Sequence, residues 1–567
     1  MRYKGAVTVQ RDQLKLLRQR PNAQVLVVGG GINGVATFRY LAMQGIDVAL
    51  IERGDYSQGA SGASSHMIHG GIRYLENGEF RLVHESVQER NSLLQIAPHY
   101  VKPLQTTIPI FSTFSGILSA PMRFLTHKSG KPTERGAALI KAGLIIYDVF
   151  AGIGGRNTPW HSFKAGRNAR KDLPALRQDV KYTATYFDAS VHNPERLTLD
   201  VLRDGLAANP QARATNYTSL SGFKDGKAQL RDELSGEQFE FEADVLVNAT
   251  GAWVDLTNED LGRETKWTGG TKGSHIVLDH PELLAATGGR EIFFEHEDGR
   301  IVLIYPMLGR VLVGTTDLEH DMREPAVCTE EEVDYFFELI HHVFPNIKVD
   351  RQDIVYRFSG VRPLPNHDDT APGFVSRDYQ VKETRLTDKT MMLSLIGGKW
   401  TTFRALGENL GGKVLNFLRA EQRQSTVGVP IGGGRNFPMN EGELDAWYAA
   451  REHRAGRERL RVLLERYGTR ADAVLDIVGE DEHLLEHSDQ LSHEELAYLA
   501  EREQVGRLID VFIRRTNLAF RGLVTNELVH EVASSLAVPM GWDGAQTDAE
   551  INHALSVLRT HHEVILT

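Results

Sequence analysis

Three glycines and one carboxylate near the start of the chain have the spacing of a site for a phosphate-containing cofactor. Gly29-x-Gly31-x-x-Gly34 follows the apolar run of residues 25–28, and Glu52 ends the next apolar run. Glycines allow a tight turn close to a pyrophosphate, which the free N–H groups of a helix N-terminus then bind. A carboxylate at position 52 can accept hydrogen bonds from a ribose 2′-hydroxyl. The pattern predicts a dinucleotide site, which NAD and FAD would both satisfy.

Two further features favour FAD over NAD. An NAD domain normally completes its sheet in one continuous stretch, whereas the strand-like segments here are scattered from residue 25 to residue 396. In addition, GGKWTT at residues 397–402 places glycines and the cation of Lys399 at a second turn from strand to helix. A helix N-terminus with a nearby lysine can stabilise the negative charge that a reduced flavin accumulates around N1 and O2. We therefore predict FAD as the cofactor.

The segments that carry these motifs indicate an α/β fold. Residues 25–28 and 48–51 are predicted as buried parallel strands that flank a helix over 33–44. Three more segments have strand character. Residues 243–253 are predicted as a strand that runs into a glycine turn, and residues 300–317 as two strands around residues 308–310. Residues 391–410 are predicted as a strand, a glycine turn at 397–398 and a helix. We expect a discontinuous FAD-binding domain and an interleaved, β-rich substrate-binding domain. The expected FAD-binding segments are 22–105, 183–265 and 354–428, and the expected substrate-binding segments are 106–182 and 266–353.

The last part of the chain differs in its sequence pattern, which changes from strand-like to helical. Residues 429–438, VPIGGGRNFP, combine three glycines with flanking prolines and predict a linker. Beyond it, apolar residues such as Leu496, Leu499, Leu508 and Val511 recur at helical spacing. We expect a separate C-terminal helical domain over residues 436–567.

The bulk composition is that of a globular protein with more than one domain. The 567 residues are 41% hydrophobic and 25% charged, which is ample for two or three cores. The formal net charge of -11 argues against nucleic acid as a partner, because phosphate binding needs a basic footprint. The single cysteine, Cys328, excludes an internal disulfide framework and fits a reducing compartment.

Three stretches bear on targeting and membrane contact. Residues 1–21 are basic but lack the apolar core of a secretory signal. Residues 137–155 contain Lys141 and Asp148, each of which would cost about 2.5–3.5 kcal/mol at a bilayer centre, so we expect no spanning helix. Residues 121–155 mix basic and apolar side chains. That mixture suits either peripheral binding at an anionic membrane surface or an amphipathic helix packed on its own domain.

Eight motifs occur in the order typical of one flavoprotein family. They are the glycine loop with its ASGASS end (residues 29–65), IHGGIRYLENGEF, NATGAWV, KGSHIVL, VGTTD, FSGVRPL, SRDY and GGKWTTFR. Together they resemble the FAD-dependent, quinone-linked glycerol-3-phosphate dehydrogenases, from about residue 24 into the helical tail. The resemblance implies a Rossmann-like FAD-binding domain of the glutathione-reductase/D-amino-acid-oxidase type, with the two further domains described above.

The resemblance also implies an activity and a set of cofactor residues. These enzymes oxidise sn-glycerol 3-phosphate at C2 to dihydroxyacetone phosphate; a hydride passes to flavin N5, and the electrons go to quinone at a membrane surface. By similarity, the residues expected at FAD are Gly29, Gly31, Gly34, Glu52, Ser64, Ser65, His69, Gly70, Gly71, Gly251, Asp317, Lys399 and Thr401.

The implied substrate site is cationic, as a phosphate dianion requires. By similarity it contains Arg73, Tyr74, His275, Arg362 and Arg377, and the implied catalytic residues are His275, Arg362 and Lys399. Arginine can bind phosphate through two parallel hydrogen bonds. His275 is the first choice for the base that takes the C2 hydroxyl proton, because an imidazole titrates near neutral pH. Arg362 competes for that role if its side chain lies nearer to C2.

The chain departs from the family pattern in three places. His66 stands where the family usually has Lys, the family's DDARL motif reads HNPERL at residues 192–197, and residues 1–21 form an added basic extension. Flavin chemistry tolerates these changes. A longer polyol phosphate, such as erythritol phosphate, would use the same chemistry and the same cations.

Other functions remain open at this stage. One is a soluble oxidase that passes electrons to oxygen, and another is a flavin-containing or nucleotide-binding regulatory module, against which the cationic pocket argues. An amine-oxidising relative would not need so many cations. The His341-His342 and His561-His562 pairs lack a ligand set for metal, so no metal is expected. The expected location is the cytoplasmic face of the inner membrane, with a membrane quinone as partner, and a homodimer is left open.

Overall fold

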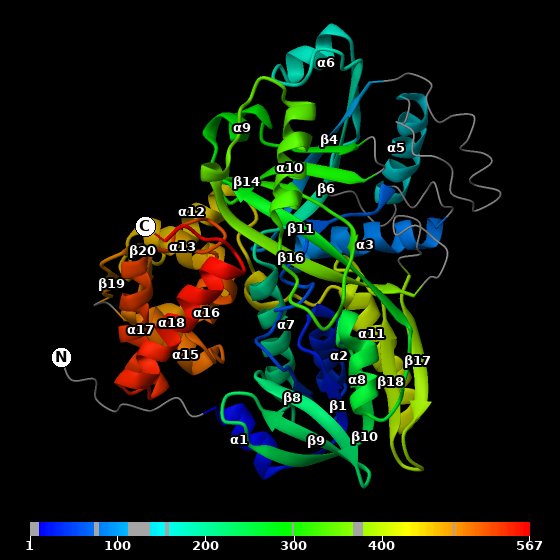
Figure 1. The fold of residues 1–567 in the computed structure, drawn as a ribbon, viewed down its shortest axis with the longest axis vertical. Helices are drawn as coiled ribbons and strands as arrows, with labels where there is room; N and C mark the ends of the chain where they lie inside the picture. Colours follow the sequence, from blue (N-terminus) through cyan, green and yellow to red (C-terminus); the bar gives the residue numbers. More distant parts are fainter. Residues whose placement is uncertain are drawn as a thin grey trace.

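The computed structural model describes residues 11–72, 79–111, 137–152, 158–296, 300–366, 378–479 and 482–566. Two sheets and a group of helices make up this part of the chain (Figure 1). One sheet lies in the lower half of the view and the other in the upper half, and the C-terminal helices lie beside them on the left. Arg73, Tyr74 and Arg377, which were predicted in the substrate site, lie outside the described residues.

The lower sheet carries the glycine loop. β1 (Asn22–Val28) pairs in parallel with β2 (Val48–Ile51) and with β10 (Gln238–Asn248), and β10 pairs in parallel with β18 (Met391–Ile396). The strand order is β17-β18-β10-β1-β2-β7, with β17 (Gln380–Arg385) and β7 (Arg213–Thr215) at the ends. The predicted strands and the predicted helix between them, α2 (Ile32–Met43), are therefore confirmed.

Both faces of the lower sheet are covered, which explains why its short strands are continuous apolar runs. Val25, Val27 and Leu50 pack against three helices, α2, α7 (Pro194–Ala208) and α11 (Phe403–Leu418). Leu26 and Ala49, which alternate with them, pack on the other side with α1 (Asp12–Gln19) and with the hairpin of β8 (Thr218–Lys224) and β9 (Lys227–Asp232).

The upper sheet is mostly antiparallel and is assembled from distant segments. Its path is β15-β11-β14-β13-β12-β4-β6-β3, with β16 paired to β11 and β5 paired to β6. The strands are β3 (Met67–Ile68), β4 (Val101–Ile110), β5 (Ser162–Ala165), β6 (Tyr182–Val191), β11 (Thr268–Leu278), β12 (Glu291–Glu295), β13 (Ile301–Met307), β14 (Arg310–Gly314), β15 (Leu318–Glu319) and β16 (Ile354–Pro365). Helix α10 (Glu330–Val343) packs on one face of this sheet.

The sheets divide the chain differently from the segments expected from sequence. β16 and nearly all of β6 belong to the upper sheet, although residues 354–365 and 183–191 were assigned to the FAD-binding part. An apolar strand pattern does not reveal which of two sheets will receive the strand. The long register of β11 with β16, from Thr268↔Pro365 to Leu278↔Ile354, decides it here.

The C-terminal region is helical, as predicted, but it is not independent of the rest. Its helices are α12 (Glu441–Ala449), α13 (Arg457–Tyr467), α14 (Ala471–Val478), α15 (His493–Arg502), α16 (Leu508–Asp510), α17 (Asn526–Met540) and α18 (Gly544–Thr560). They share one hydrophobic core with Val277, Tyr356 and Phe358, which lie on the face of the upper sheet opposite α10. The predicted linker is also tightly packed, since a Cβ at Gly433 would overlap the carbonyl oxygen of Tyr467.

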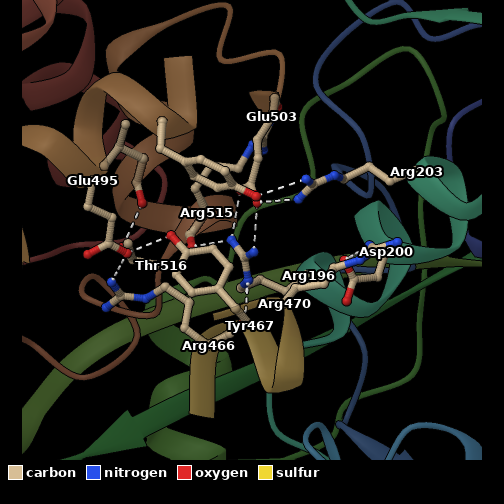
Figure 2. Close-up of polar contacts among 12 residues, drawn as sticks. Arg196, Asp200, Arg203, Arg466, Tyr467, Arg470, Glu495, Glu503, Arg515 and Thr516 are labelled. Atoms are coloured by element: carbon tan, nitrogen blue, oxygen red, sulfur yellow. Dashed lines mark hydrogen bonds and ion pairs between the residues drawn. The ribbon is translucent and has the colours of Figure 1, made fainter. Parts of the chain in front are cut away.

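Buried charges join α7 to the C-terminal helices (Figure 2). Arg196, Asp200 and Arg203 lie on one face of α7, because residues three and four apart share a helix face. Arg196 forms a bidentate pair with Glu503, with N–O distances of 2.9 Å each, and Arg203 donates to the same carboxylate at 2.8 Å. Asp200 accepts from Arg470 at 2.5 Å. The sequence motif HNPERL thus contributes an arginine to this interface.

Candidate active site

A cavity of about 2610 Å³ opens between the two sheets and extends to the C-terminal helices. Pockets for one small molecule are usually about 300–1,000 Å³, so this volume suffices for a dinucleotide together with a substrate. The predicted catalytic residues His275, Arg362 and Lys399 all line it. Most predicted cofactor residues line it as well, namely Gly29, Gly31, Glu52, Ser64, Ser65, His69, Gly71, Gly251, Asp317, Lys399 and Thr401. Gly34 and Gly70 lie behind these wall residues.

The glycine loop forms the floor of the cavity at the N-terminus of α2. Gly29 has φ +114°, a conformation that favours glycine, and a Cβ at Gly34 would overlap the carbonyl oxygen of Gly29. The third glycine therefore lets the helix approach the first strand closely. The hydroxyl of Ser61 accepts a hydrogen bond from the Ile32 N–H at 2.9 Å. The Oδ1 atom of Asn33, at the start of α2, is buried and has no hydrogen-bond partner among the described residues.

Glu52 ends β2 beside this floor. Its Oε2 accepts the N–H of Gly30 at 2.7 Å, and its Oε1 accepts the N–H of Gly54 at 2.9 Å. Burial raises the pKa of Glu52, and these two hydrogen bonds oppose the rise. Each carboxylate oxygen can accept a second hydrogen bond, so the side chain retains acceptor capacity toward the cavity.

The second glycine turn closes on the loop that follows Glu52. Trp400 donates from its indole Nε1 to the carbonyl of Ser61 at 2.9 Å. The Thr401 hydroxyl accepts the backbone N–H of His69 at 3.2 Å and lies 3.3 Å from the carbonyl oxygen of the same residue. Lys399 lies beside these contacts on the cavity wall. Residues 61–71 and 399–402, which are far apart in sequence, therefore form one continuous wall.

A buried polar cluster supports this wall from behind. The N–H of Gly70 donates to Asp188 and to the hydroxyl of Tyr147, both at 3.0 Å. Arg90, which is fully buried, donates to the same two groups at 3.0 and 2.9 Å. Gly70 has no room for a side chain, because a Cβ would overlap the Tyr147 hydroxyl and Val87. The glycine predicted at the cofactor therefore anchors the loop from its far side.

His275 lies on β11 and is almost completely buried, with 2% of its surface exposed. Its ring stacks on Phe358 with the centroids 4.7 Å apart, and its Nε2 lies 2.8 Å from the Ser65 hydroxyl. Burial, the nearby Arg362 cation and His66 lower the pKa of His275 well below 6.5, so the imidazole is neutral at neutral pH. Gly314 on the neighbouring strand makes room for the ring, since a Cβ there would overlap it.

Arg362 lies on β16 across from β11. Its Nη1 donates to the Asp317 carboxylate at 3.0 Å, and its Nη2 donates to the Thr315 hydroxyl at 2.9 Å. A Cβ at Gly273 would overlap the guanidinium, so the glycine of KGSH leaves the arginine room above the strand. About a quarter of the Arg362 side chain, 26%, is exposed at the cavity. Asp317, predicted at the cofactor, therefore contacts the predicted phosphate-binding arginine.

Two of the three departures from the family pattern, His66 and the HNPERL segment, lie close together beside the cavity. His66 is buried, stacks on Phe520 at 5.4 Å, and has an Nδ1 without a hydrogen-bond partner among the described residues. Burial and then the neighbouring His192 lower the pKa of His66 to about 4. Glu195, from HNPERL, lines the cavity, and burial raises its pKa to about 8. At neutral pH this corner holds uncharged imidazoles and a protonated carboxyl group.

Sequence reasoning missed several residues that shape the site. Ser61 and Asn33 border the glycine loop, and the Tyr305 hydroxyl donates to the carbonyl of Ser65 at 2.7 Å. Asn33 could have been found, because it sits inside the glycine motif itself. Tyr305 carries no such signal, since it lies in an apolar strand far from Ser65 in sequence. The described residues contain no group of three or more His, Cys, Asp or Glu placed to hold a metal ion.

The residues present fit FAD. The glycine loop at a helix N-terminus, the acid at the end of the second strand and the Asn33 Oδ1, which lacks a partner among the described residues, could all be completed by a bound dinucleotide. The wall formed by residues 399–402 supplies a cation and a helix N-terminus for a flavin ring. The two arrangements lie in one continuous cavity, as a cofactor with two ends requires.

Comparisons with known proteins agree with this geometry. A family model described as FAD dependent oxidoreductase matches residues 24–377, and one described as the C-terminal domain of alpha-glycerophosphate oxidase matches residues 424–547. A Synechocystis protein named glycerol-3-phosphate dehydrogenase is 33% identical over 93% of this chain and 94% of its own length. A Staphylococcus saprophyticus protein named aerobic glycerol-3-phosphate dehydrogenase is 28% identical over 90% of this chain and 89% of its own length.

A solved structure shares the fold over the whole chain. It is the glycerol-3-phosphate dehydrogenase of Bacillus halodurans complexed with FAD, which superposes with a TM-score of 0.73 at 22% identity. The match covers 98% of this chain and 99% of that one. The predicted fold class, an α/β FAD-binding fold followed by helices, is thereby confirmed.

Proposed function

Since the chain belongs to the family of FAD-dependent glycerol-3-phosphate dehydrogenases and oxidases, with FAD as cofactor, we propose that it oxidises sn-glycerol 3-phosphate at C2 to dihydroxyacetone phosphate. One observation carries the choice of substrate. The Arg362 guanidinium, held by Asp317 and Thr315, lies in the cofactor cavity next to the neutral His275. A fixed cation beside a neutral base suits a substrate that has a phosphate group and a hydroxyl group to be oxidised.

Arg362 binds the substrate phosphate in this proposal. A guanidinium binds a phosphate through two parallel N–H bonds, which set orientation as well as charge. Asp317 and Thr315 hold Nη1 and Nη2 from one side, so the arginine does not have to be ordered when substrate arrives. Arg73, Tyr74 and Arg377 are proposed as further phosphate contacts from their motif matches alone.

His275 takes the proton of the C2 hydroxyl. Its Nδ1 is buried without a partner among the described residues, whereas its Nε2 contacts Ser65 on the cavity wall. We therefore assign proton acceptance to Nε2, and Arg362 no longer competes for the role, because both of its terminal nitrogens are engaged as donors. The bound FAD supplies the acceptor for the C2 hydride at N5. As the proton and hydride leave, C2 and its oxygen form the product carbonyl.

Lys399 supplies a second positive charge to the proposed mechanism. It begins the turn into α11 on the wall that Trp400 and Thr401 fasten to residues 61–69. When FAD is bound, a cation and a helix N-terminus on this wall would stabilise negative charge on the reduced flavin. The remaining cofactor residues named above are proposed to hold the adenine, ribose and pyrophosphate parts.

A membrane quinone is proposed as the electron acceptor, with the protein bound to the membrane surface. Helix α5 (Ala137–Gly152) buries Leu144 and Tyr147 but exposes Ile145 by 47% and Val149 by 52%, whereas its Ile146 lines the cavity. Such a face, next to the exposed Lys141, suits peripheral contact with an anionic bilayer. No helix in the described part of the chain is long and apolar enough to cross a membrane.

The test of the substrate is an anaerobic titration of the FAD-loaded protein with sn-glycerol 3-phosphate, followed by the flavin absorbance. We expect stoichiometric bleaching. Its rate should fall about a hundredfold or more in Arg362→Ala, because a phosphate charge left without its cation costs several kcal/mol. The exposed Arg385→Ala is the matched control and should bleach like the wild type. No bleaching in a protein that dithionite reduces would exclude glycerol phosphate and point to erythritol phosphate.

The acceptor is tested separately in the reduced protein. Rapid reoxidation by a short-chain quinone without oxygen, with little peroxide formed in air, is expected of a quinone-linked dehydrogenase. Rapid peroxide formation in air and no response to quinone would instead make the protein an oxidase. Sedimentation with anionic vesicles, weakened in Val149→Glu, checks the proposed membrane face.

A further inference from the structure

Glu332 lies on the face of the upper sheet opposite the cavity and is buried, with 3% of its surface exposed. It belongs to the first turn of α10, and its carboxylate accepts four hydrogen bonds. Oε1 accepts from the hydroxyls of Ser274 at 2.8 Å and Thr316 at 2.6 Å. Oε2 accepts from the Lys272 ammonium at 2.7 Å and from the Thr329 N–H at 2.9 Å. All four oxygen lone-pair sites are used.

Two of these donors alternate with active-site residues on β11. Successive side chains of a strand point to opposite faces, so Lys272 and Ser274 point toward α10 while Gly273 and His275 face the cavity. Ser274 also pairs with Ser359 on β16, where the two hydroxyls are 2.7 Å apart. Glu332 is thus linked to the backbone of His275 through Ser274, the preceding residue. It is linked to β16 through Ser274 and then Ser359.

The third donor belongs to the turn that holds Arg362. Thr316 lies between Thr315 and Asp317, which are the two partners of the Arg362 guanidinium. Its hydroxyl accepts the N–H of Ser274 at 2.9 Å and donates to Glu332. The Glu332 carboxylate therefore links β11, which carries His275, to residues 315–317, which contact Arg362.

Capping of α10 does not require this arrangement. The Thr329 side chain accepts the Glu332 N–H and Glu332 Oε2 accepts the Thr329 N–H, which completes a capping box with one carboxylate oxygen. Oε1 has no part in the cap and, among the described residues, accepts only from the hydroxyls of Ser274 and Thr316. Burial raises the pKa of Glu332, but the hydrogen bonds from Lys272, Thr316 and Thr329 outweigh it and hold the pKa below its usual value. The carboxylate is ionised at neutral pH.

We propose that Glu332 is a positioning residue that sets the placement of His275 relative to Arg362. The inference rests on the proposed function, since it concerns the distance between the phosphate anchor and the base. A misplacement of about 1 Å between reacting groups can cost a hundredfold in rate. Arg362 keeps its own two partners when Glu332 is changed, so phosphate affinity is expected to survive while the rate falls.

The experiment compares Glu332→Gln with Glu331→Gln in the FAD-loaded protein. Glu331 is the exposed neighbour in the same helical turn and gives a matched loss of charge. Anaerobic flavin bleaching by sn-glycerol 3-phosphate yields the limiting rate and the half-saturating concentration. For Glu332→Gln we expect the limiting rate to fall about tenfold to a hundredfold, with half-saturation changed less than about threefold. FAD content and reduction by dithionite should match the wild type, and Glu331→Gln should stay within about twofold.

A limiting rate for Glu332→Gln within twofold of Glu331→Gln would overturn the proposal. The double variant Lys272→Met/Glu332→Gln removes the buried ammonium as well, and so separates charge balance from positioning. Recovered thermal stability with a still reduced rate supports positioning, whereas recovery of both means that Glu332 merely neutralises Lys272. If sn-glycerol 3-phosphate fails to bleach the wild type, the proposed substrate fails. The same ratio between variants is then measured with erythritol phosphate.

Discussion

Two buried polar regions of this protein differ in how their side chains are partnered. At the junction of α7 with the C-terminal helices, every labelled charge in Figure 2 meets an opposite charge or a backbone carbonyl. Glu503 is fully buried and accepts from Arg196 and Arg203, and Glu495 accepts from Arg459, Arg466 and Tyr467. These groups are satisfied within the chain.

The cavity contains the opposite arrangement. Asn33 Oδ1, His66 Nδ1 and His275 Nδ1 are buried there without hydrogen-bond partners among the described residues. Burial without a partner costs about 1–3 kcal/mol for each group, and inside a cavity a bound ligand can supply the missing partner. The comparison teaches that buried polar residues alone do not mark a functional site. Incomplete partnering inside a cavity marks it better.

The largest effect is expected from breaking the paired region at Arg196. Arg196→Met leaves Glu503 buried with Arg203 as its remaining cation, and removal of one partner from a buried pair costs about 3–5 kcal/mol. Denaturant unfolding should show this loss in the free energy of unfolding. Flavin reduction by substrate should be nearly unchanged in the folded fraction, because Arg196 does not line the cavity.

The control for Arg196 is an ion pair of the same type on the surface. Arg461 pairs with Glu458 and Glu465 but is 49% exposed, so Arg461→Met should cost less than about 1 kcal/mol. Equal losses in the two variants would mean that burial of the Figure 2 network does not distinguish it from the surface.

A smaller, pH-dependent effect is expected from His66, one of the three cavity residues with an unpartnered atom among the described residues. Its pKa of about 4 in the folded state is below the unfolded value of 6.5. The unfolded chain therefore binds this proton first, and the stability that His66 contributes is complete above pH 6.5 and is lost as the pH falls toward 4. In His66→Gln, the free energy of unfolding should depend less steeply on pH between 6 and 4.5, by up to about 1.4 kcal/mol per pH unit.

Unfolding curves at several pH values measure that slope, with His530→Gln on the exposed surface as the control. An unchanged slope in His66→Gln would show that the imidazole is already protonated in the folded protein. His66 would then no longer count among the three cavity residues with a buried atom that is unpartnered in the described part of the chain.

The smallest effect is expected at Asn33, where the cofactor should supply the missing partner. Asn33→Ala removes an orphaned acceptor, so the FAD-free protein should change in stability by less than about 1 kcal/mol. FAD affinity, measured by fluorescence titration, should weaken about threefold to tenfold, which is the worth of one hydrogen bond.

The matched control is Asn258, a buried asparagine whose partners are all within the chain. It bonds to Asn248, Thr265 and Ser394, so Asn258→Ala should cost about 1–3 kcal/mol in the FAD-free protein. A loss at Asn33 as large as that at Asn258 would contradict the idea that its Oδ1 awaits a ligand.

Much of the fold and of the cofactor side of the site could be predicted from sequence, because its signals are local. The turn, helix and acid from Gly29 to Glu52 lie within one unit of strand, helix and strand, whose spacing is set by backbone geometry. The hairpin of β13 and β14 and the turn at Gly397-Gly398 are equally local. The strands and the helix among these predictions were confirmed.

Partnership between distant residues could not be predicted in the same way. The bond of Ser65 to His275, the anchorage of Gly70 by Asp188 and the four donors of Glu332 join segments that no periodicity connects. The sequence signal of Glu332 is a capping box, which is a local motif and indicates only where α10 begins. Arg196 likewise belongs to the HNPERL segment, and nothing in that segment indicates its partner Glu503 at the C-terminal interface.

By itself, the sequence determined the dinucleotide loop, the alternation of strands and helices around it, the helical C-terminal region and the family, because residue type and spacing encode these directly. The tertiary structure alone decided which sheet receives β16, that residues 429–438 form a packed junction, and which buried charges are paired. The reason is that a side chain's local preferences limit its own conformation, whereas its partners are chosen by how sheets and helices pack in space. In this protein the packing surrounds a cavity in which some buried polar atoms have no partner among the described residues.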